Sequence, residues 1–313
     1  MQYRYIFGPV KSRRLGLSLG INNVNYKTCT YSCIYCQVGR TTRLTIDREK
    51  FYNIDDIYLE VFEIIKRDIK LDYITFVPDG EPTLDVQLGK LVEKLRDFEK
   101  PLAILTNSSL LWRSDVLDDL KRFDYVSLKI DTVHESTWRR INRPHSVLKF
   151  EDILNSIERF SKTFNKTITI EVMIVKNVND YDLNFEDTAR FIKKLSNVKK
   201  VYLAIPVRPP CEAWVKPPSS EVLVKAYNIF SKILNEDKVE VLSNLEENID
   251  NVENSLSYIL RTINVHPLKY EYALKILSRD YNYPEKVIEE LVGRGLVSIV
   301  DYLGTRFLIR KFT

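Results

Sequence analysis

The chain has 313 residues, of which 44% are hydrophobic and 29% are charged, and its formal net charge is +4. This composition excludes disordered and fibrous chains, and the length suits one large α/β domain, alone or with a small appendage. The weak positive charge permits a nucleic-acid partner without requiring one. With no secretion signal and no bilayer-spanning segment in the sequence, we expect a cytoplasmic protein without a membrane partner.

Short apolar segments alternate with amphipathic segments between about residues 15 and 245. Strands alternating with helices of this length predict parallel βαβ units with right-handed crossovers. Such units form a full or partial barrel, in which the loops after the strands build the active site, or an open doubly wound sheet. The predicted strands are 15–21, 73–77, 102–105, 125–130, 167–175, 201–205 and 239–242, and the predicted helices cover 57–65, 88–95, 116–123, 150–160, 185–195 and 222–234.

The C-terminal sixty residues differ from this pattern, so we place a domain boundary between 1–248 and 249–313. Two helices, 268–277 and 284–292, precede a hairpin that turns at Leu303-Gly304. This order resembles a small winged-helix module. It favours either nucleic-acid contact or a packing or dimerising role, and the near balance of eight basic and six acidic residues after position 268 favours packing. The residues suited to nucleic-acid contact are Lys286, Arg294, Arg306, Arg310 and Lys311.

Three cysteines lie within eight residues, as Cys29-Thr-Tyr-Ser-Cys33-Ile-Tyr-Cys36, and the fourth cysteine, Cys211, is distant in sequence. A [4Fe–4S] cluster usually takes four thiolates, so three in one loop leave one iron open to another ligand. Structural zinc usually has four ligands in paired spacings, and this loop has no second pair or nearby histidine. An odd trio in one tight loop also cannot pair off completely into disulfides. The spacing therefore favours a single iron–sulfur cluster.

The three cysteines, with Tyr35 before the third, resemble the C-x3-C-x-aromatic-C signature of radical S-adenosylmethionine (SAM) enzymes. The resemblance implies a partial (β/α)6 barrel, one [4Fe–4S] cluster ligated by Cys29, Cys33 and Cys36, and SAM bound at the open iron. It also implies reductive cleavage of SAM to a 5′-deoxyadenosyl radical that abstracts a substrate hydrogen, with an electron donor such as a ferredoxin or flavodoxin. Tyr35 either packs on the adenine of SAM or covers the cluster from water.

A second motif, Asp79-Gly80-Glu81-Pro82, directly follows the second predicted strand. It is similar to the Gly-Gly-Glu-Pro motif of radical SAM enzymes, which holds the methionyl ammonium of SAM, although Asp79 replaces the first glycine. The resemblance places Asp79, Gly80, Glu81 and Pro82 among the SAM-binding residues. The alternative is a strand-to-helix turn capped by Asp79 or Thr83.

Polar residues also follow the later strands, and the resemblance makes Asn107, Ser127, Lys129 and Asn177 candidate SAM contacts. Ser127, Lys129 and Asp131 share one face of their strand because strand side chains alternate. The alternative for Lys129 is an ion pair with Asp131, since a lone buried charge is costly. The alternative for Asn177 is a turn-forming role.

Substrate recognition is harder to assign. Residues 208–214, which include Arg208, Cys211 and Trp214, follow the sixth predicted strand and are our candidate substrate loop. Cys211 and Lys129 are the only catalytic candidates, and most single cysteines are packing residues. Arg13 and Arg14 are suited to binding a phosphate or carboxylate, or they lie at the base of the barrel.

The run from Phe7 to Gly20, followed by the cysteine loop, resembles a stand-alone radical SAM group related to the archaeal wyosine-forming tRNA enzymes (4-demethylwyosine synthases). Those enzymes carry three further upstream cysteines for a second cluster, whereas residues 1–28 contain none. The leading hypothesis is therefore a radical SAM enzyme acting on tRNA or other RNA. The alternatives are a small metabolite or a protein as substrate, or a non-catalytic iron–sulfur or zinc protein that binds nucleic acid. Many isoleucine, lysine and glutamate residues beside few glycines indicate a heat-adapted source.

Overall fold

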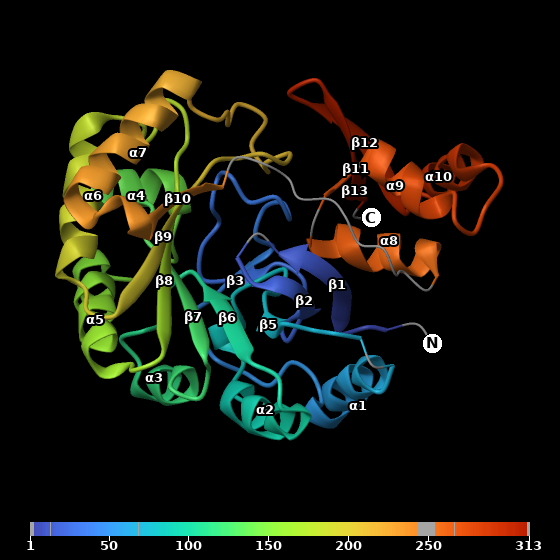
Figure 1. Ribbon diagram of the computed structural model, residues 1–313, viewed down its shortest axis with the longest axis horizontal. Coiled ribbons are helices and arrows are strands. Elements are labelled where there is room, and N and C mark those ends of the chain that lie inside the picture. Colours follow the sequence, from blue (N-terminus) through green and yellow to red (C-terminus); the bar gives the residue numbers. More distant parts are fainter. Residues whose placement is uncertain (1–2, 13, 68, 243–253, 266, 312–313) are drawn as a thin grey trace.

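The computed structural model describes residues 3–12, 14–67, 69–242, 254–265 and 267–311. Its centre is an eight-stranded sheet in the order β1-β2-β5-β6-β7-β8-β9-β10 (Figure 1). Strand β1 is antiparallel to β2, and every other neighbouring pair is parallel. The strands are β1 (Ile6–Ser12), β2 (Gly16–Ile21), β5 (Tyr73–Phe76), β6 (Leu102–Thr106), β7 (Tyr125–Lys129), β8 (Thr167–Met173), β9 (Val198–Ala204) and β10 (Val239–Leu242).

Helices cover the outer face of this curved sheet, two in the crossover from β7 to β8 and one in each other crossover between parallel strands (Figure 1). Strands β1 and β10 end the sheet and are not paired with each other in the described residues, so the barrel is open on one side. This confirms the predicted α/β fold with a partial barrel. The helices are α1 (Ile54–Ile65), α2 (Leu88–Leu95), α3 (Ser114–Leu120), α4 (Glu135–Asn142), α5 (Phe150–Thr163), α6 (Asp182–Lys194) and α7 (Ser220–Leu234).

The crossover helices form where the sequence provides a cap and one apolar face. Helix α1 begins after Asn53, whose side chain accepts a hydrogen bond from the backbone N–H of Asp55. Its buried residues Ile57, Val61 and Ile64 recur at helical spacing and face the sheet. The same periodicity explains why six of the seven barrel helices were predictable from the sequence.

Two barrel elements differ from the sequence prediction. Strand β1 contains Gly8 and Pro9, which disfavour a strand, but it is an edge strand with an irregular register between Phe7 and Val10. Helix α4 has only eight residues and carries few apolar side chains, so its periodicity gives a weak signal. Both elements contact the site described below.

In its described residues, the C-terminal module has three helices and a three-stranded sheet in the order β11-β13-β12. The predicted helices and hairpin are present, and the sequence reasoning missed α8 and β11. The predicted domain boundary, between residues 248 and 249, lies outside the described residues. The elements are α8 (Ser255–Val265), β11 (Leu268–Lys269), α9 (Tyr270–Leu277), α10 (Pro284–Gly293), β12 (Val297–Tyr302) and β13 (Thr305–Arg310).

This module lies beside the β1 end of the barrel sheet, with α8 packed against β1 (Figure 1). The hydroxyl of Tyr302 donates a hydrogen bond of 2.9 Å to the carbonyl of Pro206, which follows β9. The guanidinium of Arg310 lies 5.2 Å from the ring centroid of Tyr26, close to the cysteine loop. The module therefore contacts the barrel near the ends of its strands. No helix in the described ranges is long and apolar enough to cross a membrane.

Candidate active site

The cysteine loop follows β2 and is fixed by the turn after β5. The backbone N–H of Lys27 donates to the carbonyl of Asp79 at 3.0 Å, and the N–H of Glu81 donates to the carbonyl of Thr28 at 3.0 Å. A Cβ atom on Gly80 would lie 2.2 Å from the carbonyl oxygen of Thr28, so only glycine allows this approach. The two predicted motifs are therefore in direct contact. A short parallel pair, β3 (Thr28–Cys29) and β4 (Arg43–Leu44), forms the start and end of the loop.

Each cysteine sulfur accepts a hydrogen bond from a polar side chain. The ammonium of Lys27 lies 3.1 Å from Sγ of Cys36, and the amide of Asn107 lies 3.5 Å from Sγ of Cys29. The amide of Asn142, at the end of α4, lies 3.4 Å from Sγ of Cys33. Hydrogen-bond donors stabilise thiolate sulfur, which is the form that ligates iron. The donor set of three thiolates with these partners fits an iron–sulfur cluster.

Lys27 is only 3% exposed, so its ammonium is a buried charge. Burial alone would lower its pKa, but the thiols of Cys36 and Cys29 raise the pKa above its usual value. The cation therefore offsets negative charge on the cysteine loop. No periodicity or motif marks this residue in the sequence, apart from its position two residues before Cys29.

The two carboxylates of the turn after β5 have different surroundings. Glu81 is fully buried and accepts hydrogen bonds from the hydroxyls of Thr83 and Thr106, both at 2.6 Å, and from the N–H of Asn107 at 2.8 Å. Its carboxylate thus joins the turn to the end of β6. Oδ1 of Asp79 is buried and, within the described part of the chain, has no hydrogen-bond partner. Burial raises the pKa of Asp79 to about 6.

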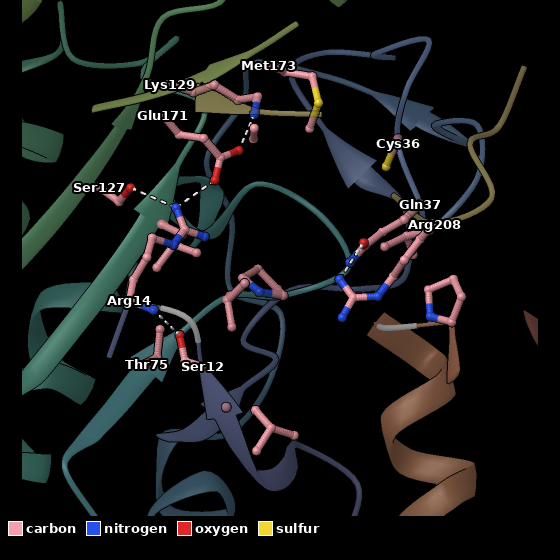
Figure 2. A pocket seen from close by; sticks show the side chains of 18 of the residues that line it. Ser12, Arg14, Cys36, Gln37, Thr75, Ser127, Lys129, Glu171, Met173 and Arg208 are labelled. Carbon is pink, nitrogen blue, oxygen red and sulfur yellow. Dashed lines mark hydrogen bonds and ion pairs between the residues drawn. The ribbon is translucent and has the colours of Figure 1, made fainter. Parts of the chain in front are cut away.

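A chain of charged side chains crosses the ends of β7 and β8. Arg14 donates to Glu171 at 2.6 Å and to the hydroxyl of Ser127 at 3.4 Å (Figure 2). The ammonium of Lys129 bonds the other carboxylate oxygen of Glu171 at 2.5 Å and lies 3.7 Å from Asp131. Burial would lower the pKa of Lys129, and the carboxylates Asp131 and Glu171 raise it. Lys129 is therefore a charged, paired side chain whose nearer partner is Glu171, although the ion pair with Asp131 is also present.

The sequence analysis named Arg14 as a candidate anion-binding residue but did not name Glu171. Glu171 lies between the buried residues Ile170 and Val172 of β8, and this alternation could have placed its side chain on the polar face. Arg14 was noted, but its partner lies 157 residues later in the chain. Arg13 lies outside the described residues.

Tyr35 is held in place by Asp131, which closely follows β7, and by Asn142 at the end of α4. Its hydroxyl donates to the carboxylate of Asp131 at 2.5 Å, and the amide of Asn142 donates to the Tyr35 hydroxyl at 3.1 Å. The ammonium of Lys129 lies 4.9 Å from the Tyr35 ring centroid. The aromatic side chain is therefore fixed between the cysteine loop and the charged chain.

These groups surround a cavity of about 400 Å³, a size typical of small-ligand sites. Of the predicted residues, Cys29, Cys33, Cys36, Tyr35, Gly80, Glu81, Asn107, Ser127 and Lys129 line it. Asp79 and Pro82 are not among its described lining residues, although both belong to the turn at its edge. One wall comes from the C-terminal module: Tyr258, Thr262, Pro267, Leu268 and Tyr272.

The structure favours the alternatives for Asn177 and Cys211. Asn177 is exposed, has a left-handed backbone with φ of 59°, and is absent from the described cavity lining, as expected of a turn former. The thiol of Cys211 donates to the carbonyls of Cys33 and Ile34, both at 3.2 Å, so it packs on the cysteine loop from outside. Of the candidate substrate loop, only Arg208 lines the cavity, where it donates to Gln37 at 3.2 Å.

A family model described as the radical SAM superfamily matches residues 26–192. The chain belongs to the radical SAM superfamily. It is 44% identical to a UPF0026 protein from Methanocaldococcus jannaschii over 97% of this chain and 95% of the relative. A UPF0026 protein from Synechocystis sp. is 34% identical over 65% of this chain and 76% of its own length.

Solved structures agree on the fold of this radical SAM protein. The structure of TYW1 with a lysine-pyruvate adduct bound has a TM-score of 0.52 at 17% identity, covering 69% of this chain and 73% of TYW1. At this identity the likeness concerns the fold alone. Membership of the superfamily establishes the protein as an enzyme that uses a [4Fe–4S] cluster and SAM. The sequence predictions of enzyme class, fold and cofactors are confirmed.

Proposed function

We propose that this protein reductively cleaves SAM at one [4Fe–4S] cluster and directs the resulting 5′-deoxyadenosyl radical to a hydrogen of its substrate. The observation that carries this proposal is the direct contact between the cysteine loop and the turn at Asp79–Pro82, at the edge of one cavity. The cofactor supplies electron transfer and radical generation, and the protein supplies binding, orientation and exclusion of water.

Some side chains of the site are suited to bind the cluster or SAM, and others stabilise the turn and the cysteine loop. The thiolates of Cys29, Cys33 and Cys36 would ligate the cluster, and Lys27 would offset its negative charge. Oδ1 of Asp79 lies in the turn at the edge of the cavity, outside the described lining, and is suited to the ammonium of a ligand that reaches this turn, because a buried carboxylate oxygen gains most from a charged donor.

At the opposite side of the cavity, Lys129 and Ser127 are suited to a ligand carboxylate or hydroxyl. Glu81 and Asn107 brace the turn and the loop through bonds to other protein groups. The ring of Tyr35 forms part of the cavity wall and excludes water from the cysteine loop.

For the substrate, the cavity favours a small molecule or a single side chain over a large surface. Its volume of about 400 Å³ must hold both SAM and the reacting group, and the C-terminal module supplies one wall. Two basic residues of the module already form ion pairs with carboxylates of the same module: Arg306 pairs with Glu271 at 2.8 Å, and Arg294 lies 3.5 Å from Glu290. The expected cationic surface for nucleic acid is therefore weak on this module.

RNA, in particular tRNA, is the second candidate substrate. It is supported by the order of elements in the C-terminal module, where a helix, a strand, two helices and a hairpin resemble the winged-helix arrangement expected from the sequence. The resemblance to wyosine-forming tRNA enzymes points the same way, although residues 1–28 hold no cysteine for a second cluster. If one base were flipped out of the RNA, that base could enter the small cavity while the rest of the large RNA stayed outside it.

Anaerobic reconstitution with iron and sulfide, followed by dithionite and SAM, tests the reaction. We expect 5′-deoxyadenosine and methionine in equal amounts, and no product from Cys33→Ala. A reconstituted protein with about four irons per chain that forms no 5′-deoxyadenosine would refute the proposal.

A gel-shift titration with bulk tRNA at moderate salt separates the two substrate classes. Binding that survives moderate salt and is lost in Lys286→Glu would favour RNA, since Lys286 is exposed on α10. Absence of binding would favour the small substrate.

A further inference from the structure

The outer side of the cysteine loop carries a cationic surface that the reaction described above does not use. It consists of Arg40, Arg143, Lys176, Trp214 and Lys216, and we call it the loop surface. All five side chains are exposed, with Arg40 at 70% and Trp214 at 49%. None is among the described residues that line the cavity.

Hydrogen bonds and packing bring these residues together over the cysteine loop. The N–H of Ser32 donates to the carbonyl of Arg143 at 3.1 Å, which ties the end of α4 to the loop. The N–H of Lys176 donates to the carbonyl of Lys216 at 3.0 Å, so these two residues are adjacent. Between them, Val175, Val178 and Val215 form one buried cluster with Ile34 and Tyr35 of the loop. The surface therefore covers the cysteine loop from outside.

The charges on this surface are strongly unbalanced. Arg40 and Arg143 converge on one buried carboxylate, that of Glu212, which neutralises only one of the two. Lys176 and Lys216 add two further positive charges, and Lys216 lies 5.4 Å from the ring centroid of Tyr302. An exposed tryptophan among arginines is a composition typical of binding hot spots.

We propose that the loop surface is the docking site of an acidic one-electron carrier protein, such as a ferredoxin or flavodoxin. This inference rests on the proposed function, since that reaction consumes one electron per SAM cleaved. In the docked complex one electron leaves the carrier, which is oxidised, and enters the cluster, which is reduced, without transfer of any atom. Complementary charge accelerates such association and makes its rate fall with salt.

Geometry favours this partner over RNA. The electron must enter from the side of the loop opposite the cavity, because the cavity side holds SAM and substrate. The thiol of Cys211, which directly precedes Glu212, bonds the carbonyls of Cys33 and Ile34 at 3.2 Å and so links this surface to a cluster ligand. An RNA bound on the loop surface would lie outside the cavity and could not present a base to it.

The test compares two reductants on the anaerobically reconstituted full-length enzyme. One is a purified acidic ferredoxin kept reduced by NADPH and its reductase, and the other is dithionite, which is too small to need docking. The readouts are bleaching of the cluster absorbance and the rate of 5′-deoxyadenosine formation. The first readout needs only the cluster, so a failure of SAM cleavage is distinguishable from a failure of docking.

The variant Lys176→Glu/Lys216→Glu should lower the ratio of ferredoxin-driven to dithionite-driven cluster reduction at least tenfold. The matched control, Lys70→Glu/Lys90→Glu, changes the same net charge at exposed positions, one before β5 and one on α2, and should leave the ratio unchanged. The ferredoxin-driven rate of the wild type should also fall as salt rises, more steeply than that of the variant.

A second variant, Trp214→Ala, should lower the same ratio without any change of charge. A ratio within twofold of the control in both variants would overturn the proposal. It would also be overturned if Lys176→Glu/Lys216→Glu lost binding of bulk tRNA while its ratio stayed unchanged, because the surface would then bind RNA.

Discussion

The buried carboxylate of Asp79 is expected to cost stability and to serve ligand binding. Its Oδ1 has no hydrogen-bond partner in the described residues, its side chain is 3% exposed, and burial raises its pKa from 3.8 to about 6. A side-chain hydrogen bond with Asn22, and then the charges of Arg310 and Lys27, lower this pKa but do not offset the effect of burial. The substitution Asp79→Asn removes the charge and keeps the shape, so it separates the two roles.

The size of the effect follows from the two pKa values. Because the folded state holds the proton more tightly than the unfolded chain, stability falls as pH rises from about 4 to about 6. At pH 8 the charge costs at most ~3 kcal/mol, and at pH 5, where Asp79 is largely protonated in the folded state, about half of that. Asp79→Asn should therefore stabilise the SAM-free protein, by more at pH 8 than at pH 5.

Urea unfolding of the cluster-loaded, SAM-free protein at both pH values measures this difference anaerobically. Equilibrium binding of SAM should weaken by about tenfold to a hundredfold, since a hydrogen bond to a charged group is worth about 1.5–3 kcal/mol. Asp85→Asn is the matched control, because burial also raises the pKa of Asp85 to about 6. Its two oxygens accept from Gln87 and Asn23, so the same pH trend should appear without loss of SAM affinity.

The outcome that refutes this reasoning is specific. If Asp79→Asn were destabilising at pH 8 and binding of SAM were unchanged, the carboxylate would be structural and its open oxygen would have no ligand. If both Asp79→Asn and Asp85→Asn weakened SAM binding equally, the effect would come from distortion of the turn.

Three further substitutions test the cysteine loop. Lys27→Met should lower the reduction potential of the cluster by an amount on the order of 100 mV, because a unit charge at about 4 Å is worth about 4 kcal/mol at an effective dielectric constant of 20. A redox titration monitored by EPR measures the potential. An unchanged potential would contradict the electrostatic role of Lys27. The Cys211→Ala protein should retain about four irons per chain, whereas the Cys33→Ala protein should lose its iron. Loss of iron from both variants would show that Cys211 is also a cluster ligand. Gly80→Ala should reduce iron retention and SAM binding, because its new methyl group would lie 2.2 Å from the carbonyl of Thr28; wild-type iron content and SAM affinity would contradict this.

Most of the barrel was predictable because its signals are local. Apolar residues at helical spacing, such as Ile57, Val61 and Ile64, and β-branched strands appear within short segments. Strand β1 was missed because Gly8 and Pro9 oppose a strand locally, and only its edge position in the sheet allows them.

The candidate site was predictable only where a motif carried it. The cysteines and the turn at Asp79–Pro82 have fixed spacing, and the structure brings them into contact. Asn177 was favoured because it follows a strand, but the left-handed turn exposes it. Glu171 was missed because no motif marks it, and its role depends on two cations from distant segments, Arg14 in the turn between β1 and β2 and Lys129 on β7.

The sequence by itself determined the chemistry of the protein: three thiolates at cluster spacing, a glycine turn one βα unit later, and an alternation that encodes a parallel α/β sheet. These features are covalent or local, so spacing and periodicity suffice to find them. Only the tertiary structure decided which charged side chains form ion pairs and which groups are buried. Arg14 and Glu171 are joined across 157 residues, the open oxygen of Asp79 results from burial, and the C-terminal module supplies a cavity wall. Such contacts and pKa shifts depend on packing between distant segments, which local sequence patterns do not specify.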